Sequence, residues 1–217
     1  MGLPRFTAAG LLPVGDHLLT FAALRQSYLV TGEGLDIPGW DAPWRGLLVD
    51  SLEMFVQQLW QQDVERIFVN GSFVTSKPRP NDIDAYFECE VLRYPHILVG
   101  LFQSEPLLPW DLVRQRIDRT TNELKPIMWH EYRVEIFPHF TDHPRPTGVH
   151  DRQDHNLYFP ELFRLGMLRG AEVFATAPVA GEAVPSSDTS MADQKLVDAL
   201  MRLMADERIY RHDNITI

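Results

Sequence analysis

The stretch that decides the fold is VNGSFVTSKPRPNDIDAYFE, residues 69–88. An apolar lead-in ends at a Gly-Ser pair, and a polar loop with two prolines follows. Asp82 and Asp84 then flank Ile83 before the chain becomes apolar again. We predict a β-strand from Asp82 onward, in which side chains two residues apart point to the same face of a sheet. The two aspartates should therefore project side by side, with Ile83 on the opposite, buried face.

Two neighbouring carboxylates repel each other unless a proton or a cation lies between them. A shared proton would make an acid–base pair, and a divalent metal is the other solution, because Mg²⁺ prefers carboxylate oxygens. Gly71 and Ser72 favour the metal. A glycine turn at the mouth of a strand exposes backbone N–H groups beside a hydroxyl, which suits a phosphate group. Carboxylates for Mg²⁺ beside such a turn indicate phosphoryl or nucleotidyl transfer.

Two further residues are candidates for the same site. Glu135 lies between Val134 and Ile136 on a predicted strand about fifty residues downstream, and it would complete a three-carboxylate cluster if that strand neighbours the first. Lys77, in the polar loop, could hold a phosphate. Simpler interpretations are a turn-capping role for Asp82, an exposed edge-strand carboxylate at Glu135 and a solvated loop cation at Lys77.

The surrounding sequence predicts an α/β (α+β) fold, in which a small, mixed, twisted sheet is flanked by helices. The clearest helix follows Pro43, where apolar residues recur at helical spacing, and we expect this stripe to pack in the core. Its members are Trp44, Leu47, Leu48, Leu52, Phe55, Val56, Leu59 and Trp60. We expect further helices at 20–28, 92–103, 109–120, 156–174 and 191–206, strands at 66–70, 82–88 and 130–140, and a polar loop at 141–156.

The same patterns suggest four segments along the chain. Residues 1–42 form an N-terminal loop and short helix, in which Thr20 could cap the helix, and residues 43–175 form the core. Residues 176–190 are a flexible linker rich in Pro, Ala and Ser, and residues 191–217 are a C-terminal helical tail. Pro138 is expected to end the pairing of the last predicted core strand.

Composition limits the classes of function. The formal net charge of −10 argues against a broad basic surface for nucleic acid, although a nucleic-acid end could still enter a local pocket. Cys89 is the single cysteine, so no intrachain disulfide can form and a reducing cytoplasm is expected. The sequence has neither a signal-peptide pattern at its start nor an apolar run of the ~18 residues that a membrane helix needs.

The motif also resembles that of a known family. Gly71-Ser72, nine intervening residues and Asp82-Ile83-Asp84 with apolar flanks resemble the signature of the DNA polymerase β-like nucleotidyltransferase superfamily. The strings GLLPVGDH and GSFVT…PNDID are similar to a small, poorly characterised bacterial branch of it. The resemblance covers roughly residues 10–170. It implies a nucleotidyltransferase-like fold in which a helix precedes the Gly-Ser turn and a third acid lies on a later strand.

This resemblance assigns roles to the candidate residues. Gly71, Ser72 and Lys77 would bind a nucleoside triphosphate, while Asp82, Asp84 and Glu135 would hold two Mg²⁺ ions, for which Mn²⁺ could substitute. The third acid is more often Asp in that superfamily, whereas this chain has Glu135. The geometry of the second metal site is therefore left undecided by the resemblance. The implied reaction is transfer of a nucleoside monophosphate to a hydroxyl, with release of pyrophosphate.

The acceptor would be a tRNA end, a protein side chain or a small molecule, and relatives suggest a toxin–antitoxin or defence system with a protein partner. The alternatives are a catalytically inactive module of the same fold that senses nucleotides or binds a partner, and a phosphohydrolase that uses the same carboxylates.

Overall fold

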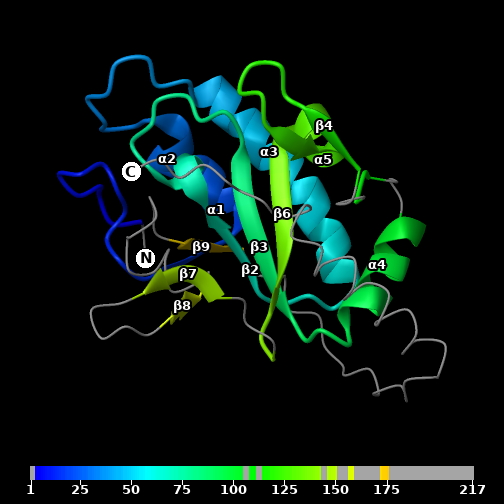
Figure 1. The fold of residues 1–217 in the computed structure, drawn as a ribbon. Helices are drawn as coiled ribbons and strands as arrows, with labels where there is room; N and C mark the ends of the chain where they lie inside the picture. Colours follow the sequence, from blue (N-terminus) through cyan, green and yellow to red (C-terminus); the bar gives the residue numbers. More distant parts are fainter. Residues whose placement is uncertain are drawn as a thin grey trace.

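A computed structural model of the protein describes residues 3–104, 108–110, 114–142, 146–150, 156–158 and 172–175. Its centre is a mixed sheet with the strand order β1-β9-β2-β3-β6 (Figure 1). The β1–β9 and β3–β6 pairs are parallel, whereas β2 is antiparallel to both of its neighbours. This sheet with flanking helices confirms the predicted mixed α/β class. The strands are β1 (Asp16–Leu19), β2 (Ile67–Asn70), β3 (Ile83–Cys89), β6 (Val134–Phe140) and β9 (Glu172–Ala175).

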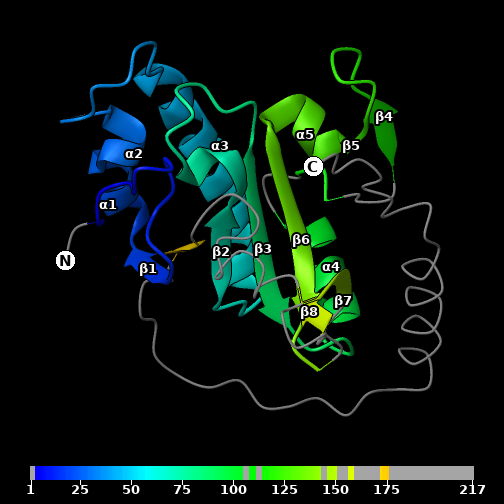
Figure 2. The ribbon, with the colours of Figure 1, turned by 60° about the vertical axis from the view of Figure 1, so that its left-hand side comes forward.

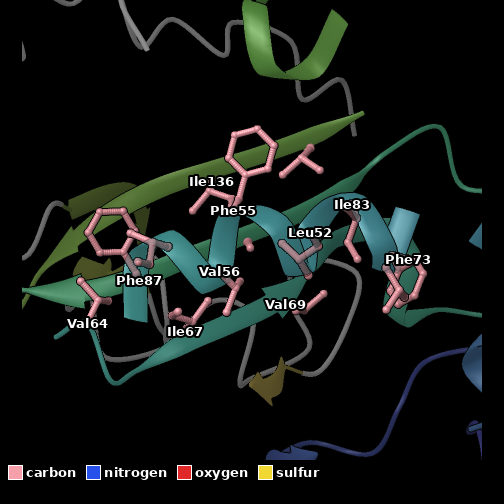
Figure 3. Close-up of a cluster of buried hydrophobic side chains, with 14 of the residues drawn as sticks. Leu52, Phe55, Val56, Val64, Ile67, Val69, Phe73, Ile83, Phe87 and Ile136 are labelled. Carbon is pink, nitrogen blue, oxygen red and sulfur yellow. The ribbon is translucent and has the colours of Figure 1, made fainter. Parts of the chain in front are cut away.

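The long helix α3 (Ala42–Gln61) covers one face of the sheet (Figures 1 and 2). It begins as predicted, with Pro43 in the first turn and the Asp41 carboxylate accepting a hydrogen bond from the Trp44 N–H at 3.0 Å. Burial of its apolar stripe against the sheet is the main stabilising contribution here. Figure 3 shows Leu52, Phe55 and Val56 of α3 among Ile67, Val69, Ile83, Phe87 and Ile136 of the strands.

One member of the predicted stripe does not lie in the core. Leu47 is 59% exposed, whereas Leu48 beside it is buried. The side chains of adjacent helical residues point about 100° apart, and at this turn of α3 the Leu48 side chain faces the core while that of Leu47 faces outward. Trp44 and Trp60 are partly buried and pack against the core, as predicted.

The predicted helix at 20–28 is two short helices, α1 (Phe21–Gln26) and α2 (Tyr28–Thr31). Thr20 caps α1 as predicted, because its hydroxyl accepts a hydrogen bond from the Ala23 N–H at 3.1 Å. Ser27 separates the helices with extended backbone angles. The predicted helix near 92–103 is also present, as α4 (Tyr94–Gln103).

The prediction of a helix at 109–120 is wrong. Residues 111–113 lie outside the described part of the chain, and the rest leads into a hairpin of β4 (Gln115–Ile117) and β5 (Leu124–Pro126). The turn explains the difference. The Asp118 carboxylate accepts hydrogen bonds from the N–H groups of Thr120 and Thr121, and Asn122 adopts a φ of 61°, so local polar contacts reverse the chain.

The predicted strand at 130–140 is partly correct. Its first residues belong to the short helix α5 (Ile127–Tyr132), which ends where Arg133 adopts a φ of 58°. The strand β6 then continues through Pro138, which lies in register with Phe87, so the expectation that Pro138 ends the pairing is wrong. Since β6 is the last strand in the described sheet, the missing N–H of Pro138 can lie on the unpaired side.

The remaining predictions fall on the C-terminal third. Part of the expected polar loop at 141–156 forms β7 (Pro146–His150), which pairs with β8 (Asn156–Tyr158). Both ends of the expected helix at 156–174 are strands: β8 pairs with β7, and β9 pairs with β1 and β2. Residues 159–171, the predicted linker at 176–190 and the tail at 191–217 lie outside the described residues. None of the described helices is long and apolar enough to cross a bilayer.

Candidate active site at the start of β3

The sheet brings two of the predicted carboxylates into register. Asp84 on β3 lies opposite Glu135 on β6, and opposite Asn70 on β2. Residues directly opposite one another project from the same face, so Asp84 is flanked by a carboxylate and an amide. Asp82 immediately precedes β3. Asn70 is buried at the end of β2, and the sequence analysis overlooked it, although a polar residue closing a buried strand just before the Gly-Ser pair was a usable signal.

Gly71 opens the short 3₁₀ helix η1 (Gly71–Val74) directly beside Asp84. Its φ is +68°, a conformation that glycine adopts without penalty. A Cβ at this position would lie 1.9 Å from Asp84 Oδ2, so only glycine allows the turn to approach the carboxylate so closely. Ser72 follows at the partly exposed surface of this turn, and Lys77 is exposed in the loop beyond it. The structure therefore places the predicted turn and one predicted carboxylate in contact.

Arg45 of α3 connects η1 and the loop after it to the helices through hydrogen bonds. Its buried guanidinium donates hydrogen bonds to the backbone carbonyls of Leu29, Phe73 and Lys77, the last at 2.9 Å. The guanidinium carbon also lies 4.7 Å from the centre of the Phe73 ring. One side chain thus links α2 and α3 to the 3₁₀ helix that begins at Gly71 and to the loop after it.

Asp82 is positioned by a tryptophan that the sequence analysis did not single out. Trp129, on α5, donates a hydrogen bond from Nε1 to Asp82 Oδ2 at 2.6 Å. Trp129 is itself buried, and the guanidinium of Arg133 lies 4.0 Å from the centre of its ring. The Arg133 carbonyl also accepts a hydrogen bond from the Ile83 N–H at 2.9 Å, so the end of α5 contacts the first two residues of the Asp-Ile-Asp motif.

Trp129→Phe is expected to weaken Mn²⁺ binding about 10-fold, because loss of a group that orients a metal ligand typically lowers affinity by this order. A smaller phenyl ring replaces the buried indole, so the variant should remain folded with a moderate loss of stability. Isothermal titration with Mn²⁺ measures the effect. Trp110→Phe is the matched control, since the Nε1 of Trp110 donates to Gln58 at 2.6 Å and not to an aspartate. Equal affinity in wild type and Trp129→Phe would show that Trp129 does not position Asp82.

Lys125 lies within the group of carboxylates. Its Nζ forms an ion pair with Glu135 Oε1 at 2.8 Å, and the two side chains are only 13% and 4% exposed. Burial opposes the charge of Lys125, yet Glu135, Asp82 and Asp84 together raise its pKa above the ordinary value. Lys125 is therefore a cation at neutral pH.

The pKa of Asp84 lies well above its ordinary value. Burial is the main cause, and the negative charges of Asp82 and Glu135 add to it, while Lys125 and Lys77 act in the opposite direction. Further positive charge beside Asp84 would favour its ionised form. The site thus favours a proton or a cation beside Asp84.

These features allow a test of whether the site suits a divalent metal. Asp82 and Asp84 supply the hard oxygen atoms that Mg²⁺ prefers, and the backbone of the Gly71 turn lies directly beside Asp84 Oδ2. A three-acid site is less suitable: in the described part of the chain, no three His, Cys, Asp or Glu side chains form a group that could hold a metal ion. Glu135 is instead paired with Lys125. Asp82 and Asp84 are therefore the two carboxylates that could hold a divalent cation.

Comparison with known proteins gives the family. Residues 4–171 match the model of a family of unknown function, DUF6932. The chain belongs to this family. The DUF6932 match includes the Gly71 turn, the two aspartates and Glu135. Searches of curated proteins and of solved structures gave no match.

Proposed function

We propose that this DUF6932 protein is a metal-dependent nucleotidyltransferase, which moves a nucleoside monophosphate from a nucleoside triphosphate to an acceptor hydroxyl and releases pyrophosphate. The observation that carries the proposal is the close approach of the Gly71 turn to Asp84. A backbone turn of a kind that can bind phosphate lies directly beside a carboxylate that nearby positive charge would stabilise.

Each residue has a role in this proposal. The N–H groups of the Gly71–Ser72 turn, the Ser72 hydroxyl and the loop cation Lys77 would bind the triphosphate. Asp82 and Asp84 would hold Mg²⁺, or Mn²⁺ in its place. The bound ion would neutralise phosphate charge and orient the phosphate oxygens.

In the reaction, the acceptor oxygen would form a bond to the α-phosphorus, the bond from the α-phosphorus to the oxygen of the leaving pyrophosphate would break, and the acceptor's proton would pass to a base or to water. The proposed acceptor remains a tRNA end, a protein side chain or a small molecule. The same proposal includes a cytoplasmic location and the nucleotidyltransferase-like details of the fold. It also includes a protein partner and a toxin–antitoxin or defence setting.

A second candidate function is a nucleotide-binding module of the same fold without catalysis. It is favoured by one observation, the ion pair between Glu135 and Lys125, because this pair engages the third acid. Such a module would be stabilised against heat by a nucleoside triphosphate and Mg²⁺ and would release no pyrophosphate.

The test uses ATP, CTP, GTP and UTP labelled at the α-phosphate, with Mg²⁺ and a cell extract. Label that appears in one macromolecule or metabolite supports transfer and identifies both donor and acceptor. Release of pyrophosphate without phosphate excludes the hydrolase alternative, which would release phosphate. The absence of transfer to any acceptor, together with nucleotide-dependent thermal stabilisation, would instead support the binding module.

A further inference from the structure

We propose that Lys125 takes the place of a second metal ion, so that the site binds a single divalent cation through Asp82 and Asp84. This inference rests on the metal site of the proposed function and concerns the number of ions that it holds. Glu135 is then a partner of Lys125 and not a metal ligand.

The first support is the position of the ammonium group. Lys125 Nζ is 2.8 Å from Glu135 Oε1, and Glu135 is in register with Asp84 on the neighbouring strand. A second ion shared by Asp84 and Glu135 would compete with this ammonium for Glu135 Oε1. The positive charge of Lys125 would also repel such an ion.

The second support is the burial of the Lys125–Glu135 ion pair and its place on regular secondary structure. Both side chains are mostly buried, so their attraction is screened less than that of a surface pair. Lys125 is on β5, where it lies opposite Arg116 of β4, and it directly precedes Pro126, the N-cap of α5. Since α5 also carries Trp129, the partner of Asp82, one short segment supplies both the cation and the group that positions the metal ligand.

The third support is the arrangement of the acids themselves. Within the residues that the structure covers, no three acidic, histidine or cysteine side chains form a group suited to a metal. Asp82 and Asp84 remain for one ion, and the positive charge of Lys125 balances Glu135. The negative charge of the site would thus be neutralised by two cations, a divalent ion that can dissociate and the Lys125 ammonium, which cannot.

The experiment counts bound Mn²⁺ at saturation by electron paramagnetic resonance, with Mn²⁺ alone as the probe. We expect one ion per chain in the wild type and one in Glu135→Gln, with affinities within about 3-fold of each other. Lys125→Met should release Glu135 and raise the count to two. The double variant Lys125→Met/Glu135→Gln should return it to one. Circular dichroism checks that each variant is folded.

The contradicting outcomes are distinct. Two ions in the wild type would overturn the inference and leave the proposed function standing. No bound ion in the wild type would overturn both. A count of one in folded Lys125→Met would show that Lys125 does not occupy a metal position. If Lys125→Met does not fold, Glu135→Gln decides alone: a retained ion supports the inference, and a lost ion contradicts it.

Discussion

Asp84→Asn is expected to lower Mg²⁺-dependent nucleotidyl transfer by about 10³-fold or more, while the protein remains folded. Metal stabilisation of phosphate charge contributes several kcal/mol to such reactions, and an amide cannot replace a carboxylate ligand. Initial rates of label transfer from an α-labelled triphosphate measure the loss. Glu88→Gln is the matched control, because Glu88 is on the same strand and forms an ion pair with Arg66 at 3.1 Å. Retention of activity in Asp84→Asn would contradict the assignment of the site.

The same substitution has a predicted effect on stability. The raised pKa of Asp84 means that the metal-free folded state binds its proton more tightly than the unfolded state does. The free energy of unfolding should therefore fall as pH rises from the ordinary pKa of aspartate to the raised pKa of Asp84. Asp84→Asn should remove this fall and leave stability at pH 7 within about 1 kcal/mol of the wild type or higher.

Urea denaturation in EDTA at several pH values tests this effect. A strongly destabilised Asp84→Asn would show that the carboxylate is structural, and the metal site would then be wrong.

Arg45→Met should lower the free energy of unfolding by about 3 kcal/mol or more, because three backbone carbonyls lose their buried donor and each unsatisfied acceptor costs about 1 to 3 kcal/mol. The carbonyls belong to Leu29, Phe73 and Lys77. Arg45→Lys should recover only part of the loss, since one ammonium cannot reproduce the planar fork of the guanidinium. Urea denaturation measures these differences.

Arg25→Met is the control for Arg45→Met. Arg25 pairs with Asp50 and Glu53 near the surface, where ion pairs contribute about 1 kcal/mol or less. Because Arg45 also holds Phe73 and Lys77, which follow the Gly71–Ser72 turn, Arg45→Met should weaken nucleotide binding at temperatures where it is still folded. A loss of less than 1 kcal/mol would show that the three hydrogen bonds do not secure the loop.

The sequence predicts correctly those elements whose apolar residues form a regular pattern along the chain. The period of α3 and the apolar run of β2 each identify one buried face or strand from local residues alone. The apolar spacing around Arg114 predicts a helix, but this segment leads into a hairpin. The turn of the hairpin depends on the Asp118 side chain and not on apolar spacing. The expectation that Pro138 ends the pairing rests on the rule that proline interrupts a sheet, and this rule does not apply to an edge strand.

The site shows the same division. Asp82, Asp84 and Gly71 follow from the spacing within one motif, and the position of Glu135 required only that two predicted strands be neighbours. Lys125 and Trp129 could not be placed in this way. Trp129 reaches Asp82 across 47 residues of sequence, and Lys125 meets Glu135 only because the β4–β5 hairpin and α5 fold over the start of β6. Tertiary packing, and not local pattern, decides these contacts.

The most direct test of the central claim is the affinity for nucleoside triphosphates with and without Mg²⁺, measured by isothermal titration for wild type and Asp84→Asn. If Asp82 and Asp84 hold the metal against a triphosphate on the Gly71 turn, the wild type should bind at least one of ATP, CTP, GTP and UTP about 10-fold or more tightly with Mg²⁺ than with EDTA. Asp84→Asn should lose this difference. Equal affinity with and without Mg²⁺ in the wild type, or the same Mg²⁺ dependence in Asp84→Asn, would contradict the account.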